Sequence, residues 1–208
     1  MKLIASGWQY KVYDLENGRV RKVKASGLFQ YIKILSHLPF QFIEAYKEQQ
    51  RVNRMERQAN DYIRTILHLE ISRALGNPVF ISQSDYEQDK VRVLYEVCKD
   101  ASFEQQKEII KSYIHLIHTT WNYGFADCIF NFTLNNGTND RGDLLQLDFG
   151  EITTEKDDVE EMIRNQRWLQ SFSYTTLVSN ELKDYYSTTM SEELTFAKLN
   201  ESWRSKLK

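Results

Sequence analysis

The feature that most restricts the fold is a pair of alternating segments joined by a very short turn. In residues 10–25, polar and apolar side chains alternate on both sides of the dipeptide Asn17-Gly18. Alternation with a period of two is typical of β-strands, and Asn-Gly is the strongest short signal for a hairpin between them. Residues 2–5 look like another strand before the hairpin. The chain is therefore predicted to begin with a three-stranded antiparallel meander.

A long helical pattern follows this meander, from about residue 43 to residue 75. Apolar side chains recur through it at steps of three and four, and Gly76 is a good helix stop. Residues 28–39, before the helix, look irregular. Two further strands are predicted over residues 79–82 and 91–97, with a polar connection between them. The first part of the chain is thus expected to contain five strands and one long helix.

The second part of the chain is predicted to be mainly helical. Ser102 opens a Ser-Phe-Glu-Gln segment that is typical of a capping box, and the helix it begins is expected to end near Gly124. Residues 129–134 and 143–149 are interpreted as a hairpin across a polar loop. The remainder is expected to be helical, with Trp168 and Trp203 as anchors. The predicted fold class is α+β.

Composition and charge exclude several classes of protein. Of the 208 residues, 41% are hydrophobic and 27% are charged, which excludes a disordered chain. The two cysteines, Cys98 and Cys128, form neither a disulfide framework nor a zinc site and favour a reducing, cytoplasmic location. No segment approaches the ~20 apolar residues of a membrane span, so no membrane partner is expected. Residues 1–75 hold 13 Lys and Arg against 7 Asp and Glu, but the charges are mixed, so nucleic acid is an unlikely partner.

The segment at residues 144–152, Leu-Leu-Gln-Leu-Asp-Phe-Gly-Glu-Ile, raises a question about chemistry. Its apolar run ends at Asp148-Phe149-Gly150. Asp-x-Gly is ordinary turn chemistry, which is one explanation for an aspartate at this point. The other explanation is a metal ligand, because Mg²⁺ prefers hard oxygen donors.

The order of these features resembles the protein-kinase-like superfamily. A glycine turn, a hairpin, a lysine-bearing strand, a long helix, two strands, a second helix and Asp-Phe-Gly follow one another between residue 3 and about residue 152. The chain resembles a small atypical, bacterial-type member. The resemblance implies a two-lobed fold, with residues 1–97 as a nucleotide-binding lobe and residues 98–208 as a reduced, mainly helical lobe. It also implies ATP and Mg²⁺ as cofactors.

The resemblance assigns roles to three polar residues of the second lobe. Asp148 and Asn131 would hold the metal ion, and Asp127 would accept the proton of the substrate hydroxyl. The catalytic loop departs from the family, because Phe125-Ala126 replaces His-Arg and Asn131 stands four residues after Asp127 rather than five. The geometry of proton acceptance is therefore expected to differ from that of the family.

In the first lobe, the resemblance implies a phosphate-pairing lysine held by a glutamate of the long helix. Lys22 is the first candidate for the lysine and Lys24 the alternative, because both share a strand face. Glu70 is the first candidate for the glutamate and Glu56 the alternative. The two are fourteen residues apart and hence roughly 21 Å apart on one helix, so only one can reach the lysine.

Four further residues are implied in nucleotide binding. Gly7 would form the phosphate loop, with Trp8 or Tyr10 able to cap the nucleotide, and Val20 would line the adenine pocket. The backbone of Glu96 and Cys98 would bind the adenine edge.

The expected function is transfer of a phosphoryl group from ATP to a small molecule or a dedicated protein substrate, since the chain lacks an Ala-Pro-Glu motif and a long activation loop. Two alternatives stay open: a non-catalytic pseudokinase module, and nucleotidyl transfer by the same residues.

Overall fold

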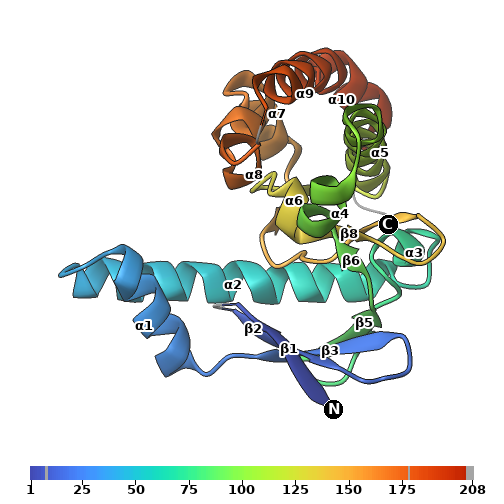
Figure 1. The fold of residues 1–208 in the computed structure, drawn as a ribbon. Coiled ribbons are helices and arrows are strands. Elements are labelled where there is room, and N and C mark those ends of the chain that lie inside the picture. The colour runs from blue at the N-terminus through green and yellow to red at the C-terminus, as the bar shows by residue number, and fades with distance from the viewer. Residues whose placement is uncertain (8, 178, 205–208) are drawn as a thin grey trace. The chain divides into compact units, whose positions relative to one another are not determined.

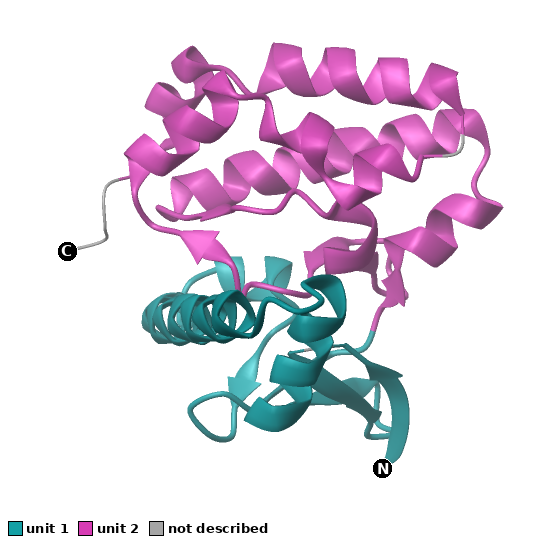
Figure 2. Cartoon of the chain, turned by 90° about the vertical axis from the view of Figure 1, so that its left-hand side faces the viewer, with its two compact units in different colours: residues 1–90 teal, residues 91–208 magenta. Residues whose placement is uncertain are grey.

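The computed structural model describes residues 1–7, 9–177 and 179–204 (Figure 1). The chain divides into two compact units, residues 1–90 and 91–208, shown in teal and magenta in Figure 2. Both helices and strands are present, so the α+β class is confirmed. The predicted lobe boundary at residue 97 falls inside a helix of the second unit, α4 (Leu94–Asp100).

The first unit contains a five-stranded antiparallel sheet. Its strands are β1 (Lys2–Ser6), β2 (Tyr10–Asp14), β3 (Arg19–Lys24), β4 (Val79–Phe80) and β5 (Tyr86–Asp89), in the spatial order β1-β2-β3-β5-β4. Gly18 has a φ of 80°, which a glycine adopts without strain, and the hairpin at Asn17-Gly18 is confirmed. The predicted meander of three strands is therefore correct.

The number of strands is as predicted, but the fifth strand is a different segment. Residues 86–89 pair with β3, whereas the strand predicted over residues 91–97 is wrong beyond Val93. Tyr86 and Gln88 are the buried residues of β5, and Glu87 and Asp89 form ion pairs with arginines of β3. A strand that buries a glutamine and exposes acids lacks the apolar alternation by which strands are identified.

Helices complete the described part of the first unit, and they differ from the prediction. Residues 28–39 are not irregular, because helix α1 (Gly27–His37) begins there, with the Ser26 hydroxyl accepting a hydrogen bond from the backbone of Phe29. The long helix α2 (Phe42–Ile66) ends well before residue 75. A turn then leads to the short helix α3 (Ile71–Ala74).

The second unit holds two small antiparallel sheets. One has the order β6-β8-β9, with β6 (Arg92–Val93), β8 (Asn136–Thr138) and β9 (Leu144–Gln146); the other pairs β7 (Ala126–Asp127) with β10 (Ile152–Thr153). The predicted hairpin exists as β8 and β9, but its first strand is displaced, because residues 132–135 form the helical turn α6 (Phe132–Asn135).

Helices form most of the second unit. The predicted capping box is confirmed at the start of α5 (Phe103–Asn122), where Ser102 and Gln105 exchange hydrogen bonds. Trp168 is buried in the core and Trp203 packs against it, as expected. The other helical elements are α7 (Lys156–Arg164), the 3₁₀ helix η1 (Arg167–Gln170), α8 (Phe172–Thr175), α9 (Asn180–Glu193) and α10 (Phe196–Ser202). Among the residues that the structure describes, none of the helices is both long enough and apolar enough to cross a lipid bilayer.

Candidate functional site

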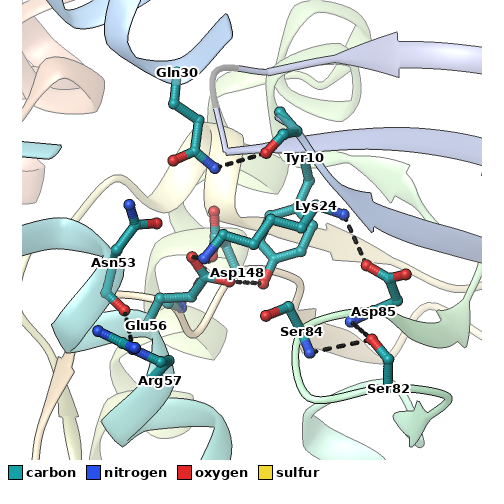
Figure 3. Close-up of polar contacts among 12 residues, drawn as sticks. Tyr10, Lys24, Gln30, Asn53, Glu56, Arg57, Ser82, Ser84, Asp85 and Asp148 are labelled. Atoms are coloured by element: carbon teal, nitrogen blue, oxygen red, sulfur yellow. Dashed lines mark hydrogen bonds and ion pairs between the residues drawn. The ribbon is translucent and has the colours of Figure 1, made fainter. Parts of the chain in front are cut away.

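A buried glutamate organises the polar cluster of the first unit. Glu56 on α2 is fully buried, and its two carboxylate oxygens each accept one hydrogen bond (Figure 3). The Tyr10 hydroxyl on β2 donates to one oxygen at 2.5 Å, and the Lys24 ammonium on β3 lies 2.7 Å from the other. A buried carboxylate is stable only when it is paired and hydrogen-bonded in this way.

The helical and strand periods explain why these residues meet. Glu56 lies on the buried stripe of α2, three or four residues from its buried neighbours Val52 and Ala59. On β3, Lys24 shares a face with Val20 and Lys22. The resulting ion pair joins the longest helix of the unit to the middle strand of its sheet.

The two candidate lysines have different environments. Lys24 is the lysine whose ammonium pairs with Glu56. Lys22 is almost fully buried, and its ammonium lies 5.4 Å from the ring centroid of Tyr86, in a cation–π arrangement. The first choice from the sequence was Lys22, but the ion pair to the helix is made by the alternative, Lys24.

The two candidate glutamates also have different environments. The expectation that Glu70 lies on the long helix is wrong, because α2 ends at Ile66 and Glu70 is the exposed residue before α3. Glu56 is the glutamate that reaches a strand lysine. The error arose because an apolar pattern continues past the point where the helix ends.

The residues assigned to nucleotide binding are placed as follows. Gly7 lies in the turn between β1 and β2 and donates its backbone N–H to the Tyr10 carbonyl at 2.9 Å, and Val20 is buried on β3. Trp8 lies outside the described residues.

Glu96 and Cys98 lie in helix α4, and of the two only Glu96 belonged to the strand predicted over residues 91–97. Their carbonyls already accept hydrogen bonds, from Arg92 and Gln106 respectively. Burial raises the pKa of the Cys98 thiol to about 11, so this cysteine is not a reactive thiolate. The adenine-binding role of this pair, which the resemblance implied from their position along the chain, stays a prediction.

The second unit brings three acidic residues together. Ile152 pairs with Asp127 across β7 and β10, and the Cys128 N–H donates to the Glu151 carbonyl at 3.0 Å. This pairing holds the turn that contains Asp148 alongside Asp127. Nearby like charges oppose the ionisation of Asp127, and both Asp148 and Glu151 act on it in this way.

Asp127 has a strongly perturbed pKa. Burial is the largest cause and, together with the negative charges of Asp148 and Glu151, raises the pKa to about 7. The backbone N–H of Ile129, which donates to the carboxylate at 2.9 Å, acts in the opposite direction. Asp127 also lines a small enclosed cavity whose walls include Tyr113 and Trp121, and these aromatic rings explain the loss of hydration. A carboxyl group with this pKa is suited to accept a proton near neutral pH.

Asp148 and Asn131 are each held in a defined local geometry. One carboxylate oxygen of Asp148 accepts the Gly150 N–H at 3.0 Å, so the Asp-x-Gly turn that the sequence offered as an ordinary explanation is present. The side-chain oxygen of Asn131 accepts a hydrogen bond from the hydroxyl of Ser173, which also binds the backbone of Thr133. Ser173 is fully buried and was not identified from the sequence, because it lies in α8, far along the chain.

Within the described parts of the chain, no group of three or more His, Cys, Asp or Glu side chains has an arrangement that could hold a metal ion by itself. A metal ion at Asp148 and Asn131 would therefore need ligands from a bound molecule. No protein-family model matches the chain. No curated protein matches it either.

Proposed function

We propose that the chain is an ATP- and Mg²⁺-dependent phosphotransferase that acts on a small molecule or on a dedicated protein substrate. The observation that carries the proposal is the acidic cluster of the second unit, in which Asp127 with its raised pKa lies beside Asp148. Neighbouring carboxylates, one of them with a raised pKa, are typical of sites that bind a metal ion and accept a proton.

The donor atoms of this cluster fit Mg²⁺. Asp148 supplies a carboxylate and Asn131 an amide oxygen, and both are hard oxygen donors. Mg²⁺ is usually held by one or two protein carboxylates together with phosphate oxygens and water, so the small number of protein ligands is compatible with a metal–nucleotide complex. When bound, the metal would neutralise charge on the phosphates. Ser173 would keep the amide oxygen of Asn131 in place.

The ion pair of the first unit supports the same function. Phosphoryl transfer needs a fixed cation near the nucleotide phosphates. Lys24, held by Glu56, is that cation in our proposal, and it replaces Lys22 as the first choice. The five-stranded antiparallel sheet with one long helix is the arrangement expected for a kinase-like nucleotide-binding lobe.

Asp127 would accept the proton of the attacking hydroxyl. Its carboxylate is oriented by the N–H of Ile129, and its pKa of about 7 means that an appreciable fraction is ionised at neutral pH. The proton moves from the hydroxyl oxygen to the carboxylate as the oxygen bonds to the γ-phosphorus and ADP leaves.

The test is nucleotide turnover by the full chain in the presence of Mg²⁺. We expect slow, metal-dependent release of ADP that is lost in Asp148→Asn and reduced at least tenfold in Asp127→Asn. Asp140→Asn, a change of the same type at an exposed residue, should retain the wild-type rate.

Three results would contradict the proposal in different ways. Release of pyrophosphate in place of ADP would indicate nucleotidyl transfer. Binding of Mg²⁺-ATP without turnover, even with a broad panel of acceptors, would indicate a binding module. An Asp148→Asn variant with full activity would remove the metal site from the account.

A further inference from the structure

Three buried side chains of the second unit line one small cavity, and each carries a polar atom without a partner. They are Tyr113 and Trp121 on α5 and Asn136 on β8, and all three are at most 3% exposed. Within the described part of the chain, the hydroxyl of Tyr113, the indole N–H of Trp121 and the amide oxygen of Asn136 make no hydrogen bond. Buried polar groups are nearly always hydrogen-bonded, so three unpaired ones around one cavity need an explanation.

The three groups are held in place by the surrounding fold. The amide nitrogen of Asn136 donates to the Phe132 carbonyl at 3.1 Å, which leaves the amide oxygen as an acceptor. The backbone of β8 is paired with strands on both sides. The Tyr113 ring packs against the Phe132 ring with 5.4 Å between centroids, and the Trp121 ring lies 5.2 Å from that of His118. These side chains therefore present a fixed set of polar atoms to the cavity.

Asp127 is the acid in the wall of the same cavity. Burial raises the pKa of the Tyr113 hydroxyl, and the neighbouring Tyr186 and Asp127 act in the same direction. The phenol therefore stays protonated and can donate a hydrogen bond. The cavity is thus bordered by two donors, on Tyr113 and Trp121, and by two acceptors, on Asn136 and Asp127.

A single water molecule matches this set of groups. The cavity has a volume of about 10 Å³, which is about the room that one buried water needs. Water accepts two hydrogen bonds and donates two, so it can pair with both donors and both acceptors. A cation would face the hydrogens of the two donors, and an anion would face the carboxylate of Asp127.

We propose that Tyr113, Trp121 and Asn136 bind one buried water molecule, which donates a hydrogen bond to the Asp127 carboxylate and holds it in place. Asp127 already accepts the backbone N–H of Ile129 at 2.9 Å, and a carboxylate has acceptor sites for further donors. A water fixed to both α5 and β8 restricts the rotation of this carboxylate.

Tyr113 thereby becomes a positioning residue for the proton acceptor. This role rests on the proposed function, in which Asp127 accepts the proton of the attacking hydroxyl. The water site itself does not rest on it, because the cavity and its polar atoms belong to the chain alone.

The test of the water site is nuclear magnetic resonance of the full, ¹⁵N-labelled chain without nucleotide. We expect a rotating-frame Overhauser contact between the Trp121 indole proton and a long-lived water. The indole proton of Trp168, which is equally buried but lies outside the wall of this cavity, should show no such contact.

A hydroxyl deletion makes this test specific. Tyr113→Phe should weaken the water contact of Trp121 and shift its indole proton resonance, because the water loses one of its partners. Tyr185→Phe is the matched control, at a partly buried tyrosine of α9 that packs against the core. It should change neither signal, and circular dichroism would verify that both variants are folded.

The test of the positioning role is the rate of Mg²⁺-dependent ADP release. We expect Tyr113→Phe to lower kcat about tenfold and to leave KM for ATP unchanged, because a loosely held carboxylate is less often oriented toward the reacting hydroxyl. Tyr185→Phe should retain both constants. A variant that was merely less stable would not show this separation of kcat from KM at a temperature where it is folded.

Several results would overturn the inference. The water site would be wrong if Trp121 showed no water contact, if Trp168 showed an equal one, or if Tyr113→Phe left the contact unchanged. A crystal structure in which the Tyr113 hydroxyl donates directly to Asn136 or Asp127 would also exclude the water. If the water were present but Tyr113→Phe kept the wild-type kcat, the positioning role would be wrong. A wild type without turnover would contradict the proposed function and the positioning role, while the resonance experiment would still decide the water site.

Discussion

The two polar clusters of the molecule contain buried acids in opposite electrostatic situations. In the first unit, the carboxylate of Glu56 receives a hydrogen bond from Tyr10 and an ion pair from Lys24. In the second unit, Asp127 lies beside Asp148 and Glu151, and burial together with these like charges raises its pKa to about 7. The carboxylate of the first cluster is paired with a cation, whereas Asp127 in the second cluster has like charges beside it.

This difference indicates what each cluster can do. A paired buried carboxylate is costly to leave without its partner, and it holds its lysine in a fixed position. A set of neighbouring carboxylates destabilises the folded state when all are ionised, and a divalent cation relieves that repulsion. In the proposed function, the first cluster would present a cation and the second would receive a metal ion.

The largest loss of stability should come from removing the charge of Glu56. We expect Glu56→Gln to lower the free energy of unfolding by about 3 kcal/mol, because Lys24 loses its buried partner. Urea denaturation measures this change. Glu70→Gln is the matched control, and because Glu70 is exposed it should change stability by less than about 0.5 kcal/mol. Equal losses of stability in the two variants would show that the ion pair of Glu56 with Lys24 does not stabilise the fold more than an exposed glutamate does.

Removal of the Lys24 ammonium should lower the free energy of unfolding less than Glu56→Gln does, but it should also weaken nucleotide binding. We expect Lys24→Met to reduce the free energy of unfolding by about 2 kcal/mol, because Glu56 keeps the hydrogen bond from Tyr10. Binding of Mg²⁺-ATP, measured by calorimetry, should weaken at least tenfold. Lys22→Met is the comparison, since this lysine shares the strand face but lies against the Tyr86 ring. If only Lys22→Met lost binding of Mg²⁺-ATP, Lys22 would again be the first candidate for the phosphate-pairing lysine.

The tyrosine should have a smaller effect than either charged residue. Tyr10→Phe removes the hydroxyl that donates to Glu56 at 2.5 Å and leaves one carboxylate oxygen without this donor. We expect a loss of about 1.5 kcal/mol in the free energy of unfolding, the usual cost of a buried acceptor that loses its hydrogen bond. Tyr13→Phe, on the same strand, serves as the control. A neutral Tyr10→Phe would mean that the ion pair with Lys24 alone holds Glu56.

An effect of the opposite sign is expected in the second unit, where removal of the Asp127 charge should stabilise the fold in a way that depends on pH. The pKa of Asp127 is raised from 3.8 to about 7 on folding, so between these values the folded state keeps a proton that the unfolded state has released. Stability is therefore lost as pH rises from about 4 to 7. Asp127→Asn cannot titrate, so it should raise the melting temperature at pH 8 and change it little at pH 4, in buffer without divalent cations. An equal change at both pH values would indicate that Asp127 is ionised throughout.

Local signals in the sequence were sufficient for part of this fold. The hairpin at Asn17-Gly18 and the capping box at Ser102 depend on residues within a few positions of one another, and both are confirmed. Strand β5 was missed because Tyr86–Asp89 is stabilised by arginines of another strand, which no local pattern shows.

In the candidate sites too, local patterns in the sequence do not show contacts between residues far apart along the chain. Asp127, Asn131 and Asp148 could be selected from their order along the chain, and the structure places Asp127 and Asp148 close enough for their charges to interact. The sequence put Lys22 before Lys24 and could not show that Lys24 pairs with Glu56, because both lysines lie on one strand face. The choice of Glu56 depended on where α2 ends, and the link between Asn131 and Ser173 depended on contacts across the fold.

The most direct test of the central claim is calorimetric titration of ATP into the wild type and Asp148→Asn, each with and without Mg²⁺. If the acidic cluster receives a metal–nucleotide complex, the wild type should bind ATP tightly only with Mg²⁺, and Asp148→Asn should lose that dependence. Binding of ATP that is equally strong without Mg²⁺, or that is unchanged in Asp148→Asn, would contradict the claim.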